Sequence, residues 1–220
     1  MTDFVVHTVP GSPFARAVLV TLEEKRARYR LAPIAPGSMR SDAYRELHPF
    51  ARMPVLDHGD FRLYETQAIL RYIDRVLPEP TLSPASSRDL ARMDQVMNIC
   101  DWYLFQGVGN VIGFQRFVAP RILGLPPDEA ACAAAMPAAH RVFAVLSGIL
   151  GAAPFLGGAS PSLADILGGT HLSILSSTPE WRELTADRPN LVGWLSRLEA
   201  RPSFAATTIE RLTSEATAAA

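Results

Sequence analysis

The stretch that decides the fold is residues 48–74, which read HPFARMPVLDHGDFRLYETQAILRYID. A short apolar run, a turn around Gly59 and a second run over residues 61–64 follow one another in its first half. Two such runs on either side of a glycine-containing turn predict a β-hairpin. Glu65-Thr66 then opens a segment whose apolar residues recur at helical spacing, so a helix is expected directly after the hairpin.

The residues before this stretch predict alternating strands and helices. Phe4–Thr8 is a β-favouring run, and Ser12-Pro13 is a typical helix start because serine caps a helix and proline suits its first position. Arg28–Leu31 predicts a second strand and Ser41–Leu47 a short helix. With the hairpin and its following helix, the expected order is β-α-β-α-β-β-α.

The second half of the chain predicts helices only. Residues 77–87 contain three prolines and several serines, which is typical of a linker. Apolar residues then step by three and four in several later segments, and Pro137 is expected to kink or split one of them. We therefore expect a first domain over residues 1–77, a linker over 78–87 and an all-helical domain over 88–220.

Composition and charge exclude several classes of protein. Hydrophobic residues make up 48% and the net charge is −1, which argues against a nucleic-acid partner. Apolar runs fall short of a membrane span and the N-terminus lacks a signal-peptide pattern, so no membrane partner is expected. Cys100 and Cys132 fit a reduced cytoplasmic protein better than a disulfide framework, and Cys and His show no metal-ligand spacing.

Residues 48–74 closely resemble the glutathione-binding core of the glutathione transferases, whose pattern is Asn-Pro-x-Gly-x-Val-Pro, a hairpin, then Glu-Ser-x-Ala-Ile. Residues 155–166, FLGGASPSLADI, resemble the Tyr-Leu-x-Gly-x-x-Ser-Leu-Ala-Asp-Ile signature of the same family. Within it, Ser162 and Asp165 have the spacing of a helix capping box. The resemblance implies an α/β plus all-α fold, with an N-terminal thioredoxin-like domain and a C-terminal helical-bundle domain.

The resemblance also implies a site for glutathione, as co-substrate and without a metal. In the family the proline at the position of Pro54 is cis, and the backbone of the preceding residue, here Met53, pairs with the cysteinyl backbone. Glu65 and Thr66 match the pair that binds the γ-glutamyl end. Taken alone, Pro54 could be an ordinary trans proline that starts a strand, and Glu65 could merely suit the helix dipole.

Arg52 is the candidate for the glycyl carboxylate, because a guanidinium fork fits a carboxylate. An exposed arginine in a loop is the plain alternative. His48 replaces the usual Asn of the family and Ala51 replaces the usual Gly, so a different path of this loop is also open.

Ser12 is the candidate catalytic residue and part of the glutathione site. Its position resembles that of the catalytic residue in Ser-type and Cys-type transferases. A hydroxyl that donates to sulfur favours the thiolate, and a helix N-terminus assists. An N-cap serine before a proline is the structural alternative, and the two roles are compatible.

The implied function is a cytoplasmic, homodimeric glutathione transferase of a Ser-type, bacterial-style kind. It would transfer the glutathione thiolate to a hydrophobic electrophile, a reaction typical of detoxification. A glutathione-dependent isomerase or dehalogenase on the same scaffold is one alternative, although the isomerase branch carries a Ser-Ser-Cys loop that Gly11-Ser12-Pro13 lacks. A non-catalytic protein-interaction module with the same fold is the other.

Overall fold

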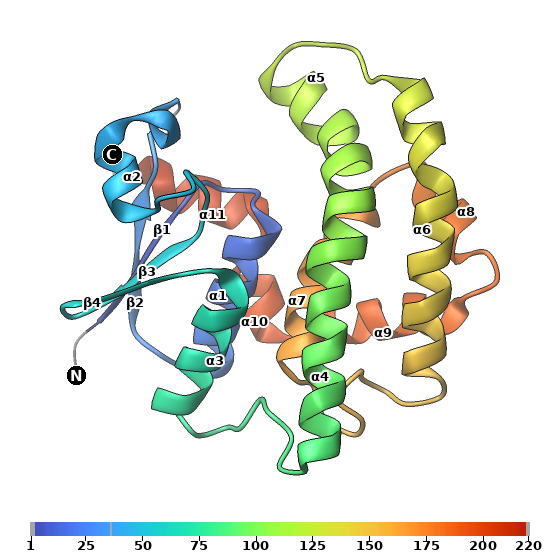
Figure 1. The fold of residues 1–220 in the computed structure, drawn as a ribbon, viewed down its shortest axis with the longest axis horizontal. Coiled ribbons are helices and arrows are strands. Elements are labelled where there is room, and N and C mark those ends of the chain that lie inside the picture. Colours follow the sequence, from blue (N-terminus) through green and yellow to red (C-terminus); the bar gives the residue numbers. More distant parts are fainter. Residues whose placement is uncertain (1–2, 36, 219–220) are drawn as a thin grey trace. The chain divides into compact units, whose positions relative to one another are not determined.

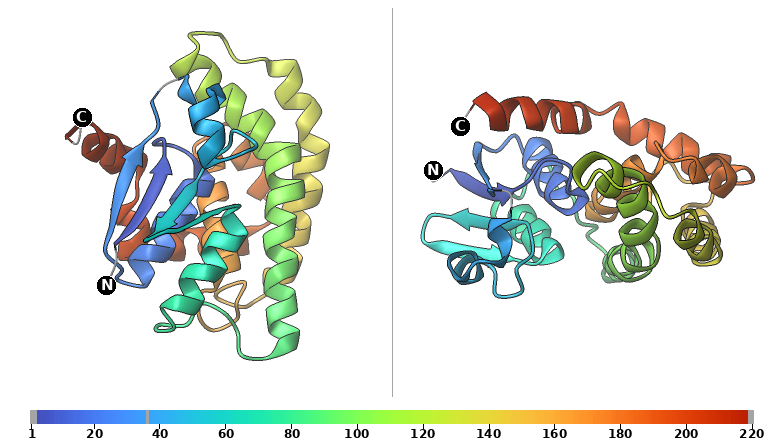
Figure 2. Two further views of the ribbon diagram at one scale, coloured as in Figure 1. Left: turned by 60° about the vertical axis from the view of Figure 1, so that its left-hand side comes forward. Right: turned by 90° about the horizontal axis from the view of Figure 1, so that it is seen from above.

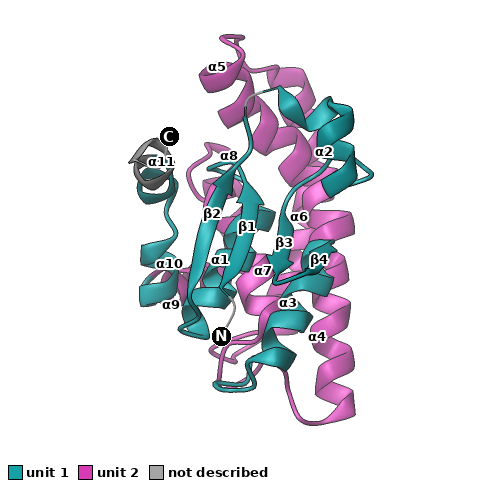
Figure 3. Cartoon of the chain, turned by 90° about the vertical axis from the view of Figure 1, so that its left-hand side faces the viewer, with its two compact units in different colours: residues 1–82, 200–220 teal, residues 83–199 magenta. Residues whose placement is uncertain are grey.

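The chain forms two compact units, coloured separately in Figure 3. The structure is a computed structural model that describes residues 3–35 and 37–218. Unit 1 comprises residues 1–82 and 200–220, and unit 2 comprises residues 83–199. The expected α/β plus all-α fold is confirmed, with a thioredoxin-like arrangement first and helices after it.

Unit 1 contains a four-stranded mixed sheet (Figure 1). Its strands are β1 (Phe4–Thr8), β2 (Tyr29–Pro33), β3 (Val55–His58) and β4 (Phe61–Tyr64), in the order β2-β1-β3-β4. β1 pairs in parallel with β2 and antiparallel with β3, and β3 pairs antiparallel with β4. The predicted hairpin is confirmed, and Gly59 adopts a φ of +67° in its turn.

The main helices of unit 1 are α1 (Pro13–Glu24) and α3 (Thr66–Val76), which pack against each other beside the sheet (Figure 1). Val18, Leu19 and Leu22 of α1 are fully buried, as are Ile69 and Ile73 of α3. Full burial of each such side chain contributes about 1.5–3 kcal/mol. The shorter elements are η1 (Ser38–Arg40), α2 (Asp42–Leu47), α10 (Pro202–Ala206) and α11 (Ile209–Ala218).

The end of the chain belongs to unit 1 by its contacts. The expected domain boundaries assigned residues 88–220 to one helical domain, whereas residues 200–220 group with the sheet. The reason is that α10 packs on α1, and Arg201 donates two hydrogen bonds of 2.7 Å to the Glu24 carboxylate.

Several chain segments begin or end at one edge of the sheet. β1 and β4 run in the same direction and end there, whereas β3 runs the other way and begins there. The paired residues His7, Val55 and Tyr64 form the last row before this edge. Since α1 follows β1 and α3 follows β4, both of these helices begin close to it.

Unit 2 is all helical. α4 (Ser87–Ile99) continues directly into η2 (Cys100–Val118), a π-helical segment, and Figure 2 shows this long helix beside α6. The remaining helices are α5 (Ala119–Ile122), α6 (Glu129–Leu150), α7 (Leu163–Leu175), α8 (Glu180–Thr185) and α9 (Pro189–Glu199). Leu104, Phe143, Leu167 and Trp194 are among the side chains of its core.

α6 departs from the sequence-based expectations in two ways. It is continuous through Pro137, so the proline does not split it. A single proline removes one of many helical hydrogen bonds in this 22-residue helix, and packing on η2 and α9 supports the rest. By length and composition α6 could also cross a membrane, contrary to the expectation that no apolar run approaches a span. A helix packed inside a domain passes the same test.

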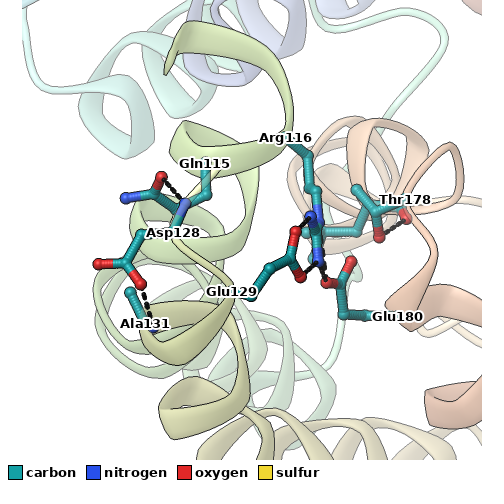
Figure 4. Close-up of polar contacts among 8 residues, drawn as sticks. Gln115, Arg116, Asp128, Glu129, Ala131, Thr178 and Glu180 are labelled. Atoms are coloured by element: carbon teal, nitrogen blue, oxygen red, sulfur yellow. Dashed lines mark hydrogen bonds and ion pairs between the residues drawn. The ribbon is translucent and has the colours of Figure 1, made fainter. Parts of the chain in front are cut away.

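Arg116 joins three helices of unit 2 (Figure 4). Its guanidinium donates to both carboxylate oxygens of Glu129 at 2.6 and 2.8 Å, at the start of α6. It also donates through Nε to Glu180, at the start of α8, over 2.9 Å. Both carboxylates accept hydrogen bonds from the same guanidinium. We therefore interpret this cluster as a structural link between the helices of unit 2.

The predicted capping box at the start of α7 is confirmed. The Asp165 carboxylate is fully buried and accepts from the backbone N–H and the hydroxyl of Ser162, each at 2.8 Å. It also accepts from the Trp194 indole at 2.8 Å and from the backbone N–H groups of Leu156 and Gly157. Five donors therefore converge on one carboxylate, which satisfies its buried charge.

Candidate functional site at the sheet edge

The candidate site residues lie around the sheet edge described above. Met53-Pro54 comes directly before β3, Glu65-Thr66 directly after β4, and Ser12 four residues after β1. Neighbouring strands lie about 4.8 Å apart, so Pro54 and Glu65 are close neighbours across the pair. The topology of unit 1 thus brings together residues that are up to 54 positions apart.

The Met53-Pro54 peptide bond is cis, as the resemblance implies. Met53 lies two residues before Val55, the residue at which β3 pairs with both of its neighbours. Within the described residues, its backbone N–H makes no hydrogen bond. The Tyr44 hydroxyl donates to the Arg52 carbonyl over 2.7 Å, and burial raises the pKa of Tyr44, which keeps this donor protonated. The segment before Met53 is therefore anchored, whereas the N–H of Met53 is left for another partner.

Glu65 has an unusual backbone conformation, with φ +70° and ψ 111°. A non-glycine residue held in such a region costs on the order of 1–3 kcal/mol, and such residues cluster at functional sites. Glu65 is the N-cap of α3, yet its side chain makes no capping hydrogen bond. The Ile69 N–H is the first to bond within the helix, to the Glu65 carbonyl, so the preceding N–H groups lack helical partners.

Thr66 is the first residue of α3 and only 7% exposed. In the part of the chain that the structure describes, its hydroxyl forms no hydrogen bond to another residue. The Thr66 hydroxyl and the N–H groups of Thr66 and Ala68, which make no bond within the described residues, form an anion-binding arrangement at the start of this 11-residue helix.

His48 is a residue of this site that the sequence reasoning treated only as a departure from the family pattern. Its side chain is buried, its ring lies 4.8 Å from the ring of Tyr64, and its Nδ1 accepts from the Phe50 N–H. Burial lowers the pKa of His48, the Glu65 carboxylate raises it and Arg52 lowers it, with a net lowering. A neutral imidazole therefore lies within electrostatic reach of both charged candidates. No local signal distinguishes it, because its role depends on Tyr64 and Glu65, which lie on another element.

Arg52 has an exposed side chain that forms no ion pair with the described residues. The loop before it turns at Ala51, whose φ is +51° and whose N–H donates to the His48 carbonyl over 2.9 Å. Ala51 thus adopts the left-handed conformation that glycine adopts most readily. The replacement of the family's glycine by alanine is accommodated by the turn itself.

Ser12 caps α1. Its Oγ accepts from the Ala15 N–H over 3.2 Å, and its carbonyl accepts from the Arg16 N–H over 2.9 Å. Capping uses a lone pair of the hydroxyl oxygen and leaves its hydrogen free to donate. The structure therefore contains the N-cap that was the structural alternative, in a form compatible with thiol activation.

The arrangement can hold an extended anionic peptide. Two helix N-termini and one exposed arginine supply positive potential, and the free backbone at Met53 offers a strand-like pairing position. No group of three potential metal ligands occurs among the residues that the structure describes. The chemistry of the edge is thus that of anion and peptide binding, next to the hydroxyl of Ser12.

The comparisons with known proteins identify the family. Residues 6–81 match the glutathione S-transferase N-terminal domain, and residues 111–202 match the glutathione S-transferase C-terminal domain. The glutathione S-transferase hmp2 of Hypomyces subiculosus is 31% identical over 207 residues, which cover 91% of this chain and 96% of that protein. A glutathione S-transferase of Hyoscyamus muticus is 28% identical over 203 residues, or 90% of this chain and 94% of that one.

A solved structure gives the same result. Glutathione S-transferase III in its apo form superimposes with a TM-score of 0.83 at 28% identity, over 93% of this chain and 95% of that chain. The chain belongs to the glutathione S-transferase family. The relatives named above come from a fungus and a plant, so the Ser-type, bacterial-style assignment stays a prediction.

Proposed function

We propose that this glutathione transferase binds glutathione at the sheet edge of unit 1 and activates its thiol with the hydroxyl of Ser12. The observation that carries the proposal is the gathering of unused polar groups there. The backbone of Met53, the hydroxyl of Thr66 and the side chain of Arg52 make no hydrogen bond with another described residue.

The backbone of glutathione would pair with Met53. An extended peptide can add to the end of a strand through main-chain hydrogen bonds. The cysteinyl residue would accept from the Met53 N–H and donate to its carbonyl, which positions the thiol near the start of α1.

The two ends of glutathione would be held by charge. The γ-glutamyl carboxylate would accept from the Thr66 hydroxyl and from N–H groups at the start of α3, and Glu65 would accept from the ammonium group. The glycyl carboxylate would bind the Arg52 fork. The Thr66 hydroxyl, the Glu65 carboxylate and the Arg52 guanidinium form no hydrogen bond or ion pair with another described residue.

Ser12 would favour the thiolate by donating a hydrogen bond to sulfur. A free thiol has a pKa of about 8.5, and hydrogen bonding to the charged form lowers it. The thiol proton passes to solvent, and the thiolate forms a carbon–sulfur bond with a hydrophobic electrophile. A leaving group, where one is present, departs with its electron pair. A serine cannot form a mixed disulfide, so conjugation is favoured over disulfide exchange.

Calorimetric titration with glutathione tests the binding site. Arg52→Ala, Glu65→Ala and Thr66→Ala should each weaken binding by roughly 1.5–3 kcal/mol, the contribution of a charge-assisted hydrogen bond. Arg28→Ala is the matched control, because Arg28 is an exposed arginine next to Tyr29 at the opposite end of the sheet. No binding heat at millimolar glutathione, or unchanged affinity in all three variants, would place the site elsewhere.

Turnover with a panel of electrophiles separates the remaining functions. Conjugation that Ser12→Ala reduces, while glutathione affinity stays nearly intact, supports the proposal. Isomerase or dehalogenase activity in the absence of conjugation would favour the alternative enzymes on this scaffold. Glutathione binding without any turnover would favour the non-catalytic interaction module.

A homodimer is part of the same proposal, since the resemblance to the family implies one. Light scattering at micromolar concentration should give twice the 24.0 kDa mass of the chain, and the mass of one chain would contradict it. The cytoplasmic location, the detoxifying role and the absence of nucleic-acid and membrane partners likewise stay predictions.

A further inference from the structure

The segment of residues 201–207 holds α1 at both of its ends, although it follows the whole of unit 2 in sequence. At the last turn of α1, the Glu24 carboxylate accepts from Arg201 twice at 2.7 Å and from the Ser203 hydroxyl at 2.5 Å. Burial raises the pKa of Glu24, but the hydrogen bonds from Arg201 and Ser203 outweigh this and lower it. The far end of the helix is thus secured by a charged pair.

At the first turn of α1, Arg16 makes the corresponding contacts. Its Nη2 donates to the Phe204 carbonyl over 3.2 Å, and its Nε lies 3.5 Å from the Thr207 hydroxyl. Its guanidinium carbon lies 5.4 Å from the centre of the Phe204 ring, which is fully buried. Three kinds of contact therefore fix the orientation of one side chain.

The position of Arg16 is unfavourable for the helix itself. A positive charge near a helix N-terminus opposes the helix dipole, which stabilises cations at the other end. Helix stability alone thus gives no reason for an arginine here. Its contacts with the segment of residues 201–207 supply one.

Arg16 is directly linked to Ser12. Its backbone N–H donates to the Ser12 carbonyl over 2.9 Å and closes the first turn of α1, while the Ser12 hydroxyl caps the residue before Arg16. We propose that Arg16 is a positioning residue for Ser12, held in place by residues 201–207. This inference rests on the proposed role of Ser12 in thiol activation.

The test compares the ionisation of bound glutathione in a series of variants. The pKa of the bound thiol is read from a pH titration of the ultraviolet absorbance of the thiolate, and kcat is measured in parallel. Arg16→Ala should raise that pKa and lower kcat about tenfold, because a small displacement of a catalytic group has effects of this size or larger. Glutathione KM should change little, since Arg16 lies outside the proposed binding contacts.

A double-mutant cycle shows whether Arg16 acts through Ser12. In a Ser12→Ala background, Arg16→Ala should have little further effect on kcat or on the thiol pKa. Additive losses would overturn the inference, because a direct effect of charge or a general loss of structure persists without the hydroxyl. If Ser12→Ala alone leaves both quantities unchanged, the proposed function fails instead, so the two failures are distinguishable.

Two further variants complete the test. Arg16→Lys keeps the positive charge but not the planar fork, so positioning predicts a raised thiol pKa, whereas a wild-type pKa would overturn the inference. This variant also serves if Arg16→Ala does not fold. Glu24→Gln breaks the contact at the other end of α1 and should lower thermal stability without moving the thiol pKa. If Glu24→Gln raised the thiol pKa as much as Arg16→Ala does, the inference would be overturned, because any loosening of α1 would then have the same effect.

Discussion

The first turns of α3 in unit 1 and α7 in unit 2 differ in how they treat the N–H groups that lack partners within the helix. At α7, the side chains of Ser162 and Asp165 occupy the N-terminal groups of the helix and are themselves fully bonded and buried. At α3, the Glu65 side chain makes no capping bond, its φ is positive, and the Thr66 hydroxyl has no partner in the described chain. A helix start that is closed by its own residues contributes stability, and one that is left open is available to a ligand.

The largest expected effect comes from opening the closed start. Asp165→Ala would leave five donors, three of them buried, without their acceptor, which should cost roughly 3–5 kcal/mol of the free energy of unfolding. Urea unfolding of the variant measures this loss. Asp187→Ala, which removes an exposed carboxylate in the same unit, is the control. A loss below about 1 kcal/mol would show that the capping groups find other partners.

α7 also contains a buried histidine, His171, and its protonation should lower the free energy of unfolding in acid. Burial lowers the pKa of His171 to about 4, although a hydrogen bond with the Leu167 carbonyl raises it. An unfolded histidine has a pKa of about 6.5, so the unfolded state takes up the proton first. The stability from neutral His171 is complete above pH 6.5 and is lost as the pH falls towards 4, by about 3 kcal/mol.

Urea unfolding at several pH values checks this dependence. In His171→Gln, the change in stability between pH 6.5 and 4 should be smaller than in the native chain by about that amount. His140→Gln, at a half-exposed histidine, is the control. Equal slopes in the native chain and in His171→Gln would contradict the prediction.

The open start of α3 should respond in the opposite sense. Glu65→Gly removes a proposed ligand contact, so glutathione affinity should fall by about 1.5–3 kcal/mol. Glycine also relieves the positive φ, whose cost is about 1–3 kcal/mol, so the free energy of unfolding should stay level or rise. Calorimetry measures the glutathione affinity and urea unfolding the free energy of unfolding, both on one preparation. A variant that loses stability and keeps its affinity for glutathione would mean that Glu65 stabilises the start of α3 and does not bind the ligand.

The smallest effect is expected at the cysteines, which belong to the buried part of unit 2. Burial raises the pKa of Cys100 and of Cys132, and Asp101 and Asp165 raise that of Cys100 further. Both thiols should therefore resist a thiol-reactive reagent until the chain unfolds. The double variant Cys100→Ser with Cys132→Ser should keep its turnover. Loss of conjugation in that variant would mean that a cysteine, and not Ser12, does the chemistry.

Much of the candidate site could be predicted because its signals are local. The hairpin, the proline before β3 and the polar pair after β4 lie within 27 consecutive residues. His48 was missed as a contributor because its environment comes from Tyr64 and from the charges of Arg52 and Glu65, not from its neighbours in sequence. Pro137 was expected to kink or split its helix, and the split does not occur because packing within unit 2 outweighs one missing hydrogen bond.

The sequence by itself determined the elements whose signals act between near neighbours. These are the strand runs, the helix starts at Ser12 and Ser162, and the capping box, each of which depends on residues within one or two turns. Only the tertiary structure decided which of these ends meet at one sheet edge and that Arg201 and Phe204 return to α1. Glu24 and Arg201 are separated by 177 positions, and a contact across such a distance is selected by the packing of the whole unit, which leaves no periodic pattern in the chain.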